Sequence, residues 1–135
     1  LTILGVEWQR LLKLSDWNVK YHIVRSWDLS RETVGHVDYQ WERREATVKV
    51  IEAGDYPPNA DFPLDTEQTV VHELLHVHFA PMGLKSGTPE GTAEEVAVNA
   101  IALCLVHLKR MALTGDLKEQ PLLVEPQWGP QWGEK

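Results

Sequence analysis

The spacing of apolar residues divides the first half of the chain into one helix and three strands. Leucine and tryptophan recur at helical spacing among charged and amide side chains over residues 3–14, which predicts an amphipathic helix. A period of two begins at Trp17 and returns over residues 34–41 and 46–51, and such alternation is typical of half-buried strands. Because only the charged residues 42–45 separate the second strand from the third, we expect an antiparallel hairpin there.

The second half of the chain is predicted to form two helices, each with a suitable N-cap. Asp65 or Thr66 caps the first, and the apolar pattern behind it predicts a helix that ends at Phe79. A stretch rich in glycine, serine, threonine and proline follows and predicts a loop. Thr92 ends this loop as the expected cap of a long helix over residues 93–113.

Together these elements predict an α+β fold with an N-terminal helix, a small antiparallel sheet of about three strands, and two helices behind it. A length of 135 residues suits one domain, which we place at residues 1–115. Residues 116–135 form a tail rich in proline, tryptophan and glycine, in which the sequence PQWG occurs twice in succession. Since two tryptophans are costly to leave in water, packing on the domain and docking on a partner both stay open.

Charge and composition narrow the classes of partner. The chain has 13 Lys and Arg against 20 Asp and Glu, and the net charge of −7 argues against binding to nucleic acid. No apolar run approaches the roughly 18–20 residues that a membrane span requires, and the N-terminus lacks a secretory signal pattern. We therefore expect no membrane association and a cytoplasmic location. The single cysteine, Cys104, excludes an internal disulfide and a zinc site built from cysteines alone.

The candidate chemistry lies in the predicted helix that ends at Phe79, where residues 72–76 are His-Glu-Leu-Leu-His. A spacing of four places His72 and His76 on one helix face, one turn apart, so that both imidazoles can reach one Zn²⁺ ion. Glu73 is rotated away from that axis, where its carboxylate can contact a metal-bound water and act as general base. The motif therefore predicts zinc-assisted hydrolysis.

A catalytic zinc site needs a third protein ligand beside the two histidines. His78 points to a different face of the same helix, so the candidates are the carboxylates of Glu94 and Glu95 on the next helix. Asn99 follows Glu95 by one helical turn and faces the same way, where it can hydrogen-bond a ligand imidazole. Because Glu94 shares its face with apolar residues, Glu95 is the preferred ligand and Glu94 the alternative.

The segments VVHELLHVHF and EEVAVNAIALCL resemble the gluzincin-type zinc metallopeptidases, in which HExxH is followed by a glutamate on the next helix. More closely, they are similar to compact metallopeptidases encoded by phages and prophages. The resemblance implies a zincin-like fold and Zn²⁺ as cofactor, with His72, His76 and Glu95 as ligands and Glu73 as base. It also implies a peptide or protein substrate that pairs with the sheet edge, in the cytoplasm of a bacterial or phage-infected cell.

Larger gluzincins add a subdomain whose His or Tyr stabilises the oxyanion, and the resemblance leaves this residue open here. Tyr56, His78 and His107 are candidates, although His107 lies in an apolar helix and is expected to be a core histidine. Two other functions stay open beside a peptidase. A zincin scaffold can hold zinc and recognise a protein partner without turnover, or zinc can serve as a structural staple.

Overall fold

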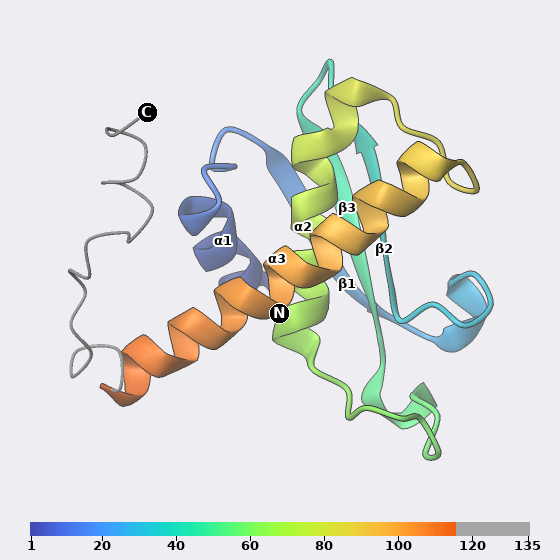
Figure 1. The fold of residues 1–135 in the computed structure, drawn as a ribbon, viewed down its shortest axis with the longest axis vertical. Coiled ribbons are helices and arrows are strands. Elements are labelled where there is room, and N and C mark those ends of the chain that lie inside the picture. The colour runs from blue at the N-terminus through green and yellow to red at the C-terminus, as the bar shows by residue number, and fades with distance from the viewer. Residues whose placement is uncertain (116–135) are drawn as a thin grey trace, which may run out of the picture.

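The computed structural model describes residues 1–115, which fold into three α-helices, three strands and three short 3₁₀ turns (Figure 1). In chain order these are α1 (Thr2–Leu11), β1 (Asn18–Val24), η1 (Ser26–Asp28), β2 (Gly35–Gln40), β3 (Glu45–Ile51), η2 (Ala53–Asp55), α2 (Thr66–Phe79), η3 (Ala80–Met82) and α3 (Pro89–Thr114). This order confirms the predicted α+β class. The predicted tail of residues 116–135 lies outside the described residues.

The sheet is mixed, with the strand order β1-β3-β2. β2 runs antiparallel to β3, which confirms the predicted hairpin. β1 runs parallel to β3, so the expectation of a sheet that is antiparallel throughout is wrong. β1 and β2 are consecutive in the chain but lie on opposite sides of β3, so the chain crosses the sheet between them. The alternation within a single strand gives no information about that crossing. As a result, β2 lies at an edge of the described sheet.

Helix α2 is the central element of the core. It packs against β2 and β3 of the sheet and also against α1 and α3, as Figure 1 shows. Val48 and Val50 of the middle strand are fully buried, as are Val70, Val71 and Leu74 of α2. Burial of this apolar surface is the main favourable contribution to folding, and it holds α2 in one orientation on the sheet. The face of α2 that carries the HExxH histidines is thereby kept beside β2 and α3.

Helix α3 begins one turn earlier than the sequence predicts. Its N-cap is Thr88, whose hydroxyl accepts a hydrogen bond from the backbone N–H of Gly91 at 3.1 Å. Thr92 therefore lies inside the helix and is not the cap. Both threonines satisfy the capping pattern, but only Thr88 is followed by a proline, and Pro89 suits the first helical position.

Two N-terminal elements are shorter than predicted. Helix α1 ends at Leu11 instead of residue 14, because Lys13 adopts a left-handed conformation with φ of 62°. The alternation that begins at Trp17 predicts a strand of about ten residues, with Ile23 on the same face as Tyr21. Strand β1 instead ends at Val24, and Ile23 is 61% exposed. The reason is that α2 packs chiefly over β2 and β3, whereas β1 lies at the opposite edge of the sheet.

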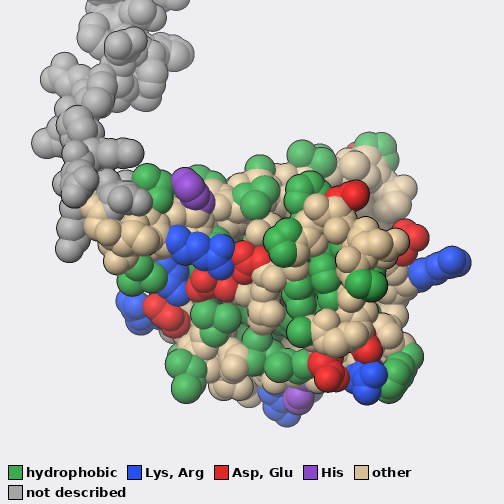
Figure 2. Space-filling view, turned by 90° about the horizontal axis from the view of Figure 1, so that it is seen from below, with side chains coloured by type: hydrophobic (Ala, Val, Ile, Leu, Met, Phe, Trp, Pro, Cys, Tyr) green, Lys and Arg blue, Asp and Glu red, His purple; other side chains and the backbone are tan. Residues whose placement is uncertain are grey.

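Ion pairs join the beginning of α2 to the second half of α3. Arg110 contacts Asp65 at 2.8 Å and Lys109 contacts Glu67 at 2.7 Å. Glu67 also accepts a hydrogen bond from the indole N–H of Trp8 on α1 at 2.9 Å. Figure 2 views this face, where basic and acidic side chains lie next to one another. These contacts help to fix where α3 crosses α2.

Helix α3 packs on the domain along one side only. Val98, Ala102 and Val106 form its buried side and lie one turn apart. Its outer side exposes Val96 and Leu103 to solvent. Among the described residues, α3 is the one helix that is long and apolar enough to cross a membrane, judged by length and composition alone.

Candidate metal centre

The two motif histidines lie on a helix whose start is firmly capped. The carboxylate of Asp65 accepts a hydrogen bond from the backbone N–H of Gln68 at 3.1 Å, which confirms Asp65 as one of the two predicted caps. One turn of α2 separates His72 from His76, and both side chains are half-buried. Their Nε2 atoms are 3.2 Å apart. The local helix geometry thus brings two imidazole nitrogens to one point.

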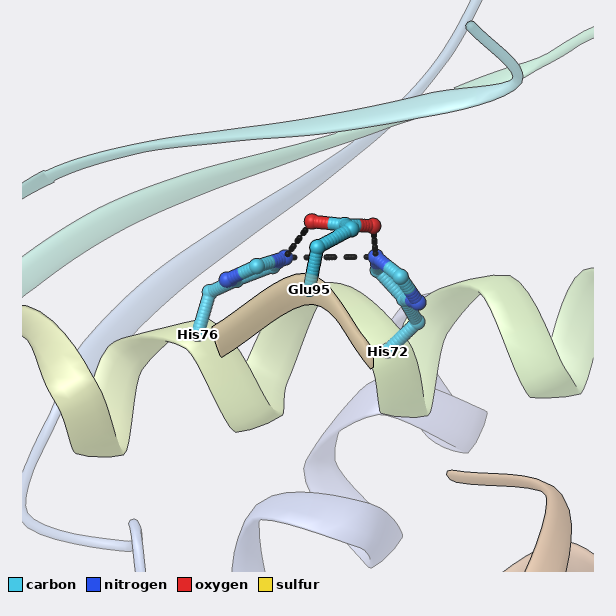
Figure 3. A group of neighbouring side chains, drawn as sticks. All are labelled: His72, His76 and Glu95. Atoms are coloured by element: carbon cyan, nitrogen blue, oxygen red, sulfur yellow. Dashed lines mark hydrogen bonds and ion pairs between the residues drawn. The ribbon is translucent and has the colours of Figure 1, made fainter. Parts of the chain in front are cut away.

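Glu95 of α3 completes the group, as Figure 3 shows. One carboxylate oxygen lies 2.8 Å from Nε2 of His72, and the other lies 3.1 Å from Nε2 of His76. All three residues offer ligand atoms within 4.8 Å of one another. The group of His72, His76 and Glu95, called the metal group below, could therefore hold a metal ion.

The spacing of the donor atoms suits a small divalent ion. Two imidazole nitrogens at about 2.0–2.1 Å from one tetrahedral zinc ion lie about 3.3 Å apart. The observed Nε2–Nε2 separation of 3.2 Å agrees with that value. The carboxylate of Glu95 faces both nitrogens, so an ion between the rings would have an anionic oxygen as its third protein ligand.

Glu94, the alternative ligand, contacts the other side of one of these rings. Its carboxylate oxygen lies 3.3 Å from Nδ1 of His76, and its side chain is only 12% exposed. A hydrogen on Nδ1 can be donated to this carboxylate, which leaves the lone pair on Nε2 directed at the group. The structure thus brings Glu95 into the metal group and places Glu94 behind the imidazole of His76.

Asn99 lines the same cleft as His72 and lies one turn after Glu95 on α3. Burial lowers the pKa of His72 below its ordinary value, although the neighbouring charge of Glu95 opposes that shift. The neutral imidazole is the form that binds a metal, so this environment favours coordination.

Glu73 is buried beside the group, with a side chain that is 9% exposed. Its carboxylate oxygen lies 3.9 Å from Nε2 of His72, too far for a hydrogen bond but close enough for one water to bridge to an ion. Burial raises the pKa of Glu73 to about 8, and the charge of Glu95 adds to the effect. A carboxyl group in this range can accept and release a proton near neutral pH.

The group opens into a cleft with a volume of about 850 Å³. Its walls come from edge strand β2, from α2, from the start of α3 and from the loop before α3. Among the described residues that line it there is no lysine or arginine. Four glutamates line it: Glu32, Glu73, Glu94 and Glu95. The cleft is therefore large enough for several residues of a peptide, and its wall is acidic.

The residues predicted to stabilise an oxyanion lie elsewhere. The hydroxyl of Tyr56 donates to the backbone oxygen of Phe62, and Nε2 of His78 lies 2.7 Å from the backbone oxygen of Leu12. His107 is exposed, so the expectation that it belongs to the core is wrong. Only one side of α3 is packed, and the apolar character of the helix does not reveal which side that is.

Tyr39 of β2 lines the cleft, and sequence reasoning did not single it out. Burial raises the pKa of its hydroxyl above the ordinary value, and the charge of Glu94 adds to this, so the group stays a hydrogen-bond donor at neutral pH. The alternating pattern placed Tyr39 on the same strand face as Val37. Nothing in that pattern indicates that this strand is the one next to the metal group.

We compared the chain with known protein families, curated proteins and solved structures. No family description, no curated protein and no solved structure matches the chain.

Proposed function

We propose that the chain is a zinc-dependent metallopeptidase in which Glu73 is the general base. The observation that carries the proposal is the convergence of His72, His76 and Glu95 next to a buried Glu73 at the wall of an open cleft. Structural zinc sites usually have four protein ligands, whereas catalytic sites have three and an open position. A three-residue group that borders a cleft agrees with the catalytic kind.

The donor set and the HExxH spacing together favour zinc. Two imidazoles and one carboxylate suit Zn²⁺ and Fe²⁺, whereas Mg²⁺ and Ca²⁺ prefer oxygen alone. Two histidines four residues apart on a helix, with a glutamate after the first, are typical of zinc peptidases. When bound, a zinc ion supplies Lewis-acid polarisation of a carbonyl and lowers the pKa of water. Hydrolysis adds water across the C–N bond, so one proton must pass from the water to the leaving amine. In this proposal the carboxylate of Glu73 accepts that proton and returns it to the amine nitrogen, and its position 3.9 Å from Nε2 of His72 supports the role.

The edge strand supports an extended peptide as substrate. The backbone oxygen of Val34 accepts a hydrogen bond from Ile51 on the β3 side, and the antiparallel register alternates from there. The backbone groups of Gly35, Val37 and Tyr39 consequently point away from β3, toward the free edge. All three residues line the cleft. A peptide that enters the cleft can pair with them as an additional strand.

Replacement of the proposed base tests the reaction. We expect Glu73→Gln to keep stoichiometric zinc, measured by elemental analysis of protein purified without added metal, and to lower peptide hydrolysis by about 100-fold or more. His72→Ala should lose the zinc. Glu90→Gln, an exposed glutamate of α3 outside the cleft, is the matched control and should change neither quantity. A wild-type protein that binds no zinc, or a Glu73→Gln variant that hydrolyses peptides normally, would contradict the proposal.

One observation favours a second candidate function. None of the three residues predicted for the oxyanion, Tyr56, His78 and His107, lines the cleft. A zincin-like module that keeps zinc and recognises a protein partner without turnover needs no such residue. In that case Glu73→Gln would leave both zinc content and partner binding unchanged, and purified protein would cleave no member of a random peptide library.

A further inference from the structure

The edge strand and the proposed base come into contact at a residue without a side chain. We propose that Gly35 is a positioning residue: the absence of its side chain lets β2 lie against α2, so that Glu73 is held beside the free strand edge. This inference rests on the proposed peptidase function and goes beyond the group of His72, His76 and Glu95, to which Gly35 contributes no ligand atom.

The space around Gly35 is already filled by α2. A Cβ atom at position 35 would lie 2.6 Å from Cγ2 of Thr69, a separation below any normal van der Waals contact. It would also lie 3.1 Å from the carboxylate oxygen of Glu73 and 3.3 Å from its Cγ. The backbone of Gly35 is not in the left-handed region, so the requirement is one of space.

Thr69 cannot easily move its methyl group out of the way. Its hydroxyl donates a hydrogen bond to the backbone oxygen of Asp65 at 3.0 Å, which fixes the side-chain rotamer. Cγ2 is therefore held toward β2. Any side chain at position 35 therefore has to move the strand away from Thr69, and it also presses on the Glu73 carboxylate, because Thr69 and Glu73 lie one turn apart on the same face of α2.

Gly35 also belongs to the strand edge that would receive the substrate. Its N–H and C=O groups point away from β3, while the position that a side chain would occupy faces Glu73. A peptide residue paired with Gly35 thus lies next to the base. Gly35 would in this way set both the position of Glu73 and the register of the bound peptide along β2. A shift of about 1 Å between the Glu73 carboxylate and the peptide would lower the rate of catalysis.

The test is a set of three full-length variants: Gly35→Ala, Thr69→Ser and the double variant. Serine keeps the hydroxyl that bonds Asp65 but lacks the Cγ2 methyl group, so it removes the closest of the three contacts. We expect Gly35→Ala to keep stoichiometric zinc and to lower kcat on a cleaved library peptide by about 10- to 100-fold. The double variant should recover a large part of that loss, which defines a coupling between the two positions.

Gly54→Ala is the matched control, because Gly54 has no neighbour closer than 4.0 Å to its missing Cβ. It should leave kcat unchanged. Full activity in Gly35→Ala, or a loss that Thr69→Ser does not reduce, would overturn the inference. A general loss of structure would instead remove zinc and affect KM together with kcat.

A second measurement separates this inference from the proposed reaction. In the ¹H–¹⁵N spectrum of the zinc-loaded protein, the backbone amides of Thr69 and Glu73 should shift in Gly35→Ala and return toward their original positions in the double variant. If the wild type cleaves no peptide, the peptidase proposal fails, while these shifts still report the contact. Unchanged amide shifts at both residues would overturn the inference whatever the activity.

Discussion

Glu94 and Glu95 approach the imidazole of His76 from two sides: the carboxylate of Glu94 lies 3.3 Å from Nδ1, and that of Glu95 lies 3.1 Å from Nε2. Two consecutive residues of α3 thereby serve different atoms of one ring. This is possible because α3 crosses α2 close to His76, within reach of both side chains. The arrangement puts one carboxylate in the group that could hold a metal ion and the other where it can orient the ring.

This difference predicts unequal effects on zinc affinity. For Glu94→Gln we expect a loss of zinc affinity of about 10- to 100-fold, because that residue only orients the ring. Glu95→Gln removes an anionic ligand and should weaken zinc binding more than this. Competition with a chromophoric chelator measures both dissociation constants. If Glu94→Gln weakened zinc binding more than Glu95→Gln, the assignment of the third ligand would have to be exchanged.

Tyr39 is the phenol that lines the cleft, and its hydroxyl stays protonated at neutral pH. If it donates a hydrogen bond to the oxyanion, Tyr39→Phe should lower kcat by about 10- to 100-fold with little change in zinc content. Tyr56→Phe is a matched control, since Tyr56 does not line the cleft and bonds the backbone of Phe62. Equal kcat values for the two variants would exclude Tyr39 from the reaction.

The acidic wall of the cleft predicts a preference for basic peptides. Glu32 carries a carboxylate that is free of the metal group, and no described lysine or arginine lines the cleft. We expect peptides with Lys or Arg near the cleaved bond to have higher kcat/KM than neutral analogues, and this advantage to fall as salt is added. Glu32→Gln should reduce the advantage by about 2- to 5-fold, as for an exposed charge pair. Equal cleavage of basic and neutral peptides at low salt would refute the preference.

The contact between Asp65 and Arg110 predicts a pH-dependent contribution to stability. The guanidinium of Arg110 holds the pKa of Asp65 below its ordinary value, chiefly through a side-chain hydrogen bond. Because the folded-state pKa is the lower one, the stabilisation is present above the unfolded-state pKa of about 3.9 and is lost as the pH falls through the folded-state pKa.

Arg110→Met should therefore lower the free energy of unfolding by about 1 kcal/mol at neutral pH, with a smaller effect in acid. Urea denaturation over a range of pH measures this difference. Arg31→Met serves as a control, because Arg31 is exposed and forms no ion pair within the described part of the chain. A penalty for Arg110→Met that stayed constant into acid would show that lost packing and not charge is responsible.

Several features were predictable because they depend on residues close together in the chain. The Asp65 cap, the hairpin between β2 and β3, and the shared face of His72 and His76 follow from hydrogen bonds and periodicities that span only a few residues. The start of α3 shows the limit of such reasoning, since Thr88 and Thr92 both carry a local capping signal.

Long-range packing decided the rest. The parallel pairing of β1 with β3 depends on how the chain crosses the sheet, and the exposure of His107 depends on which side of α3 meets α2. The alternation of apolar residues is the same for either pairing, and α3 carries apolar residues on its exposed side as well as on its buried side. Local patterns therefore could not distinguish these outcomes.

The same distinction between local spacing and long-range packing applies to the candidate site. By itself, the sequence placed His72 and His76 on one helix face with Glu73 next to them, because helical spacing fixes these positions. It narrowed the third group to Glu94 or Glu95 and preferred Glu95. Only the tertiary structure decided that Glu95 faces the histidines, that Tyr39 lines the cleft and that Gly35 touches Glu73. Each of these features depends on how β2 or α3 packs beside α2, so its geometry follows from packing in the core and not from any spacing along the chain.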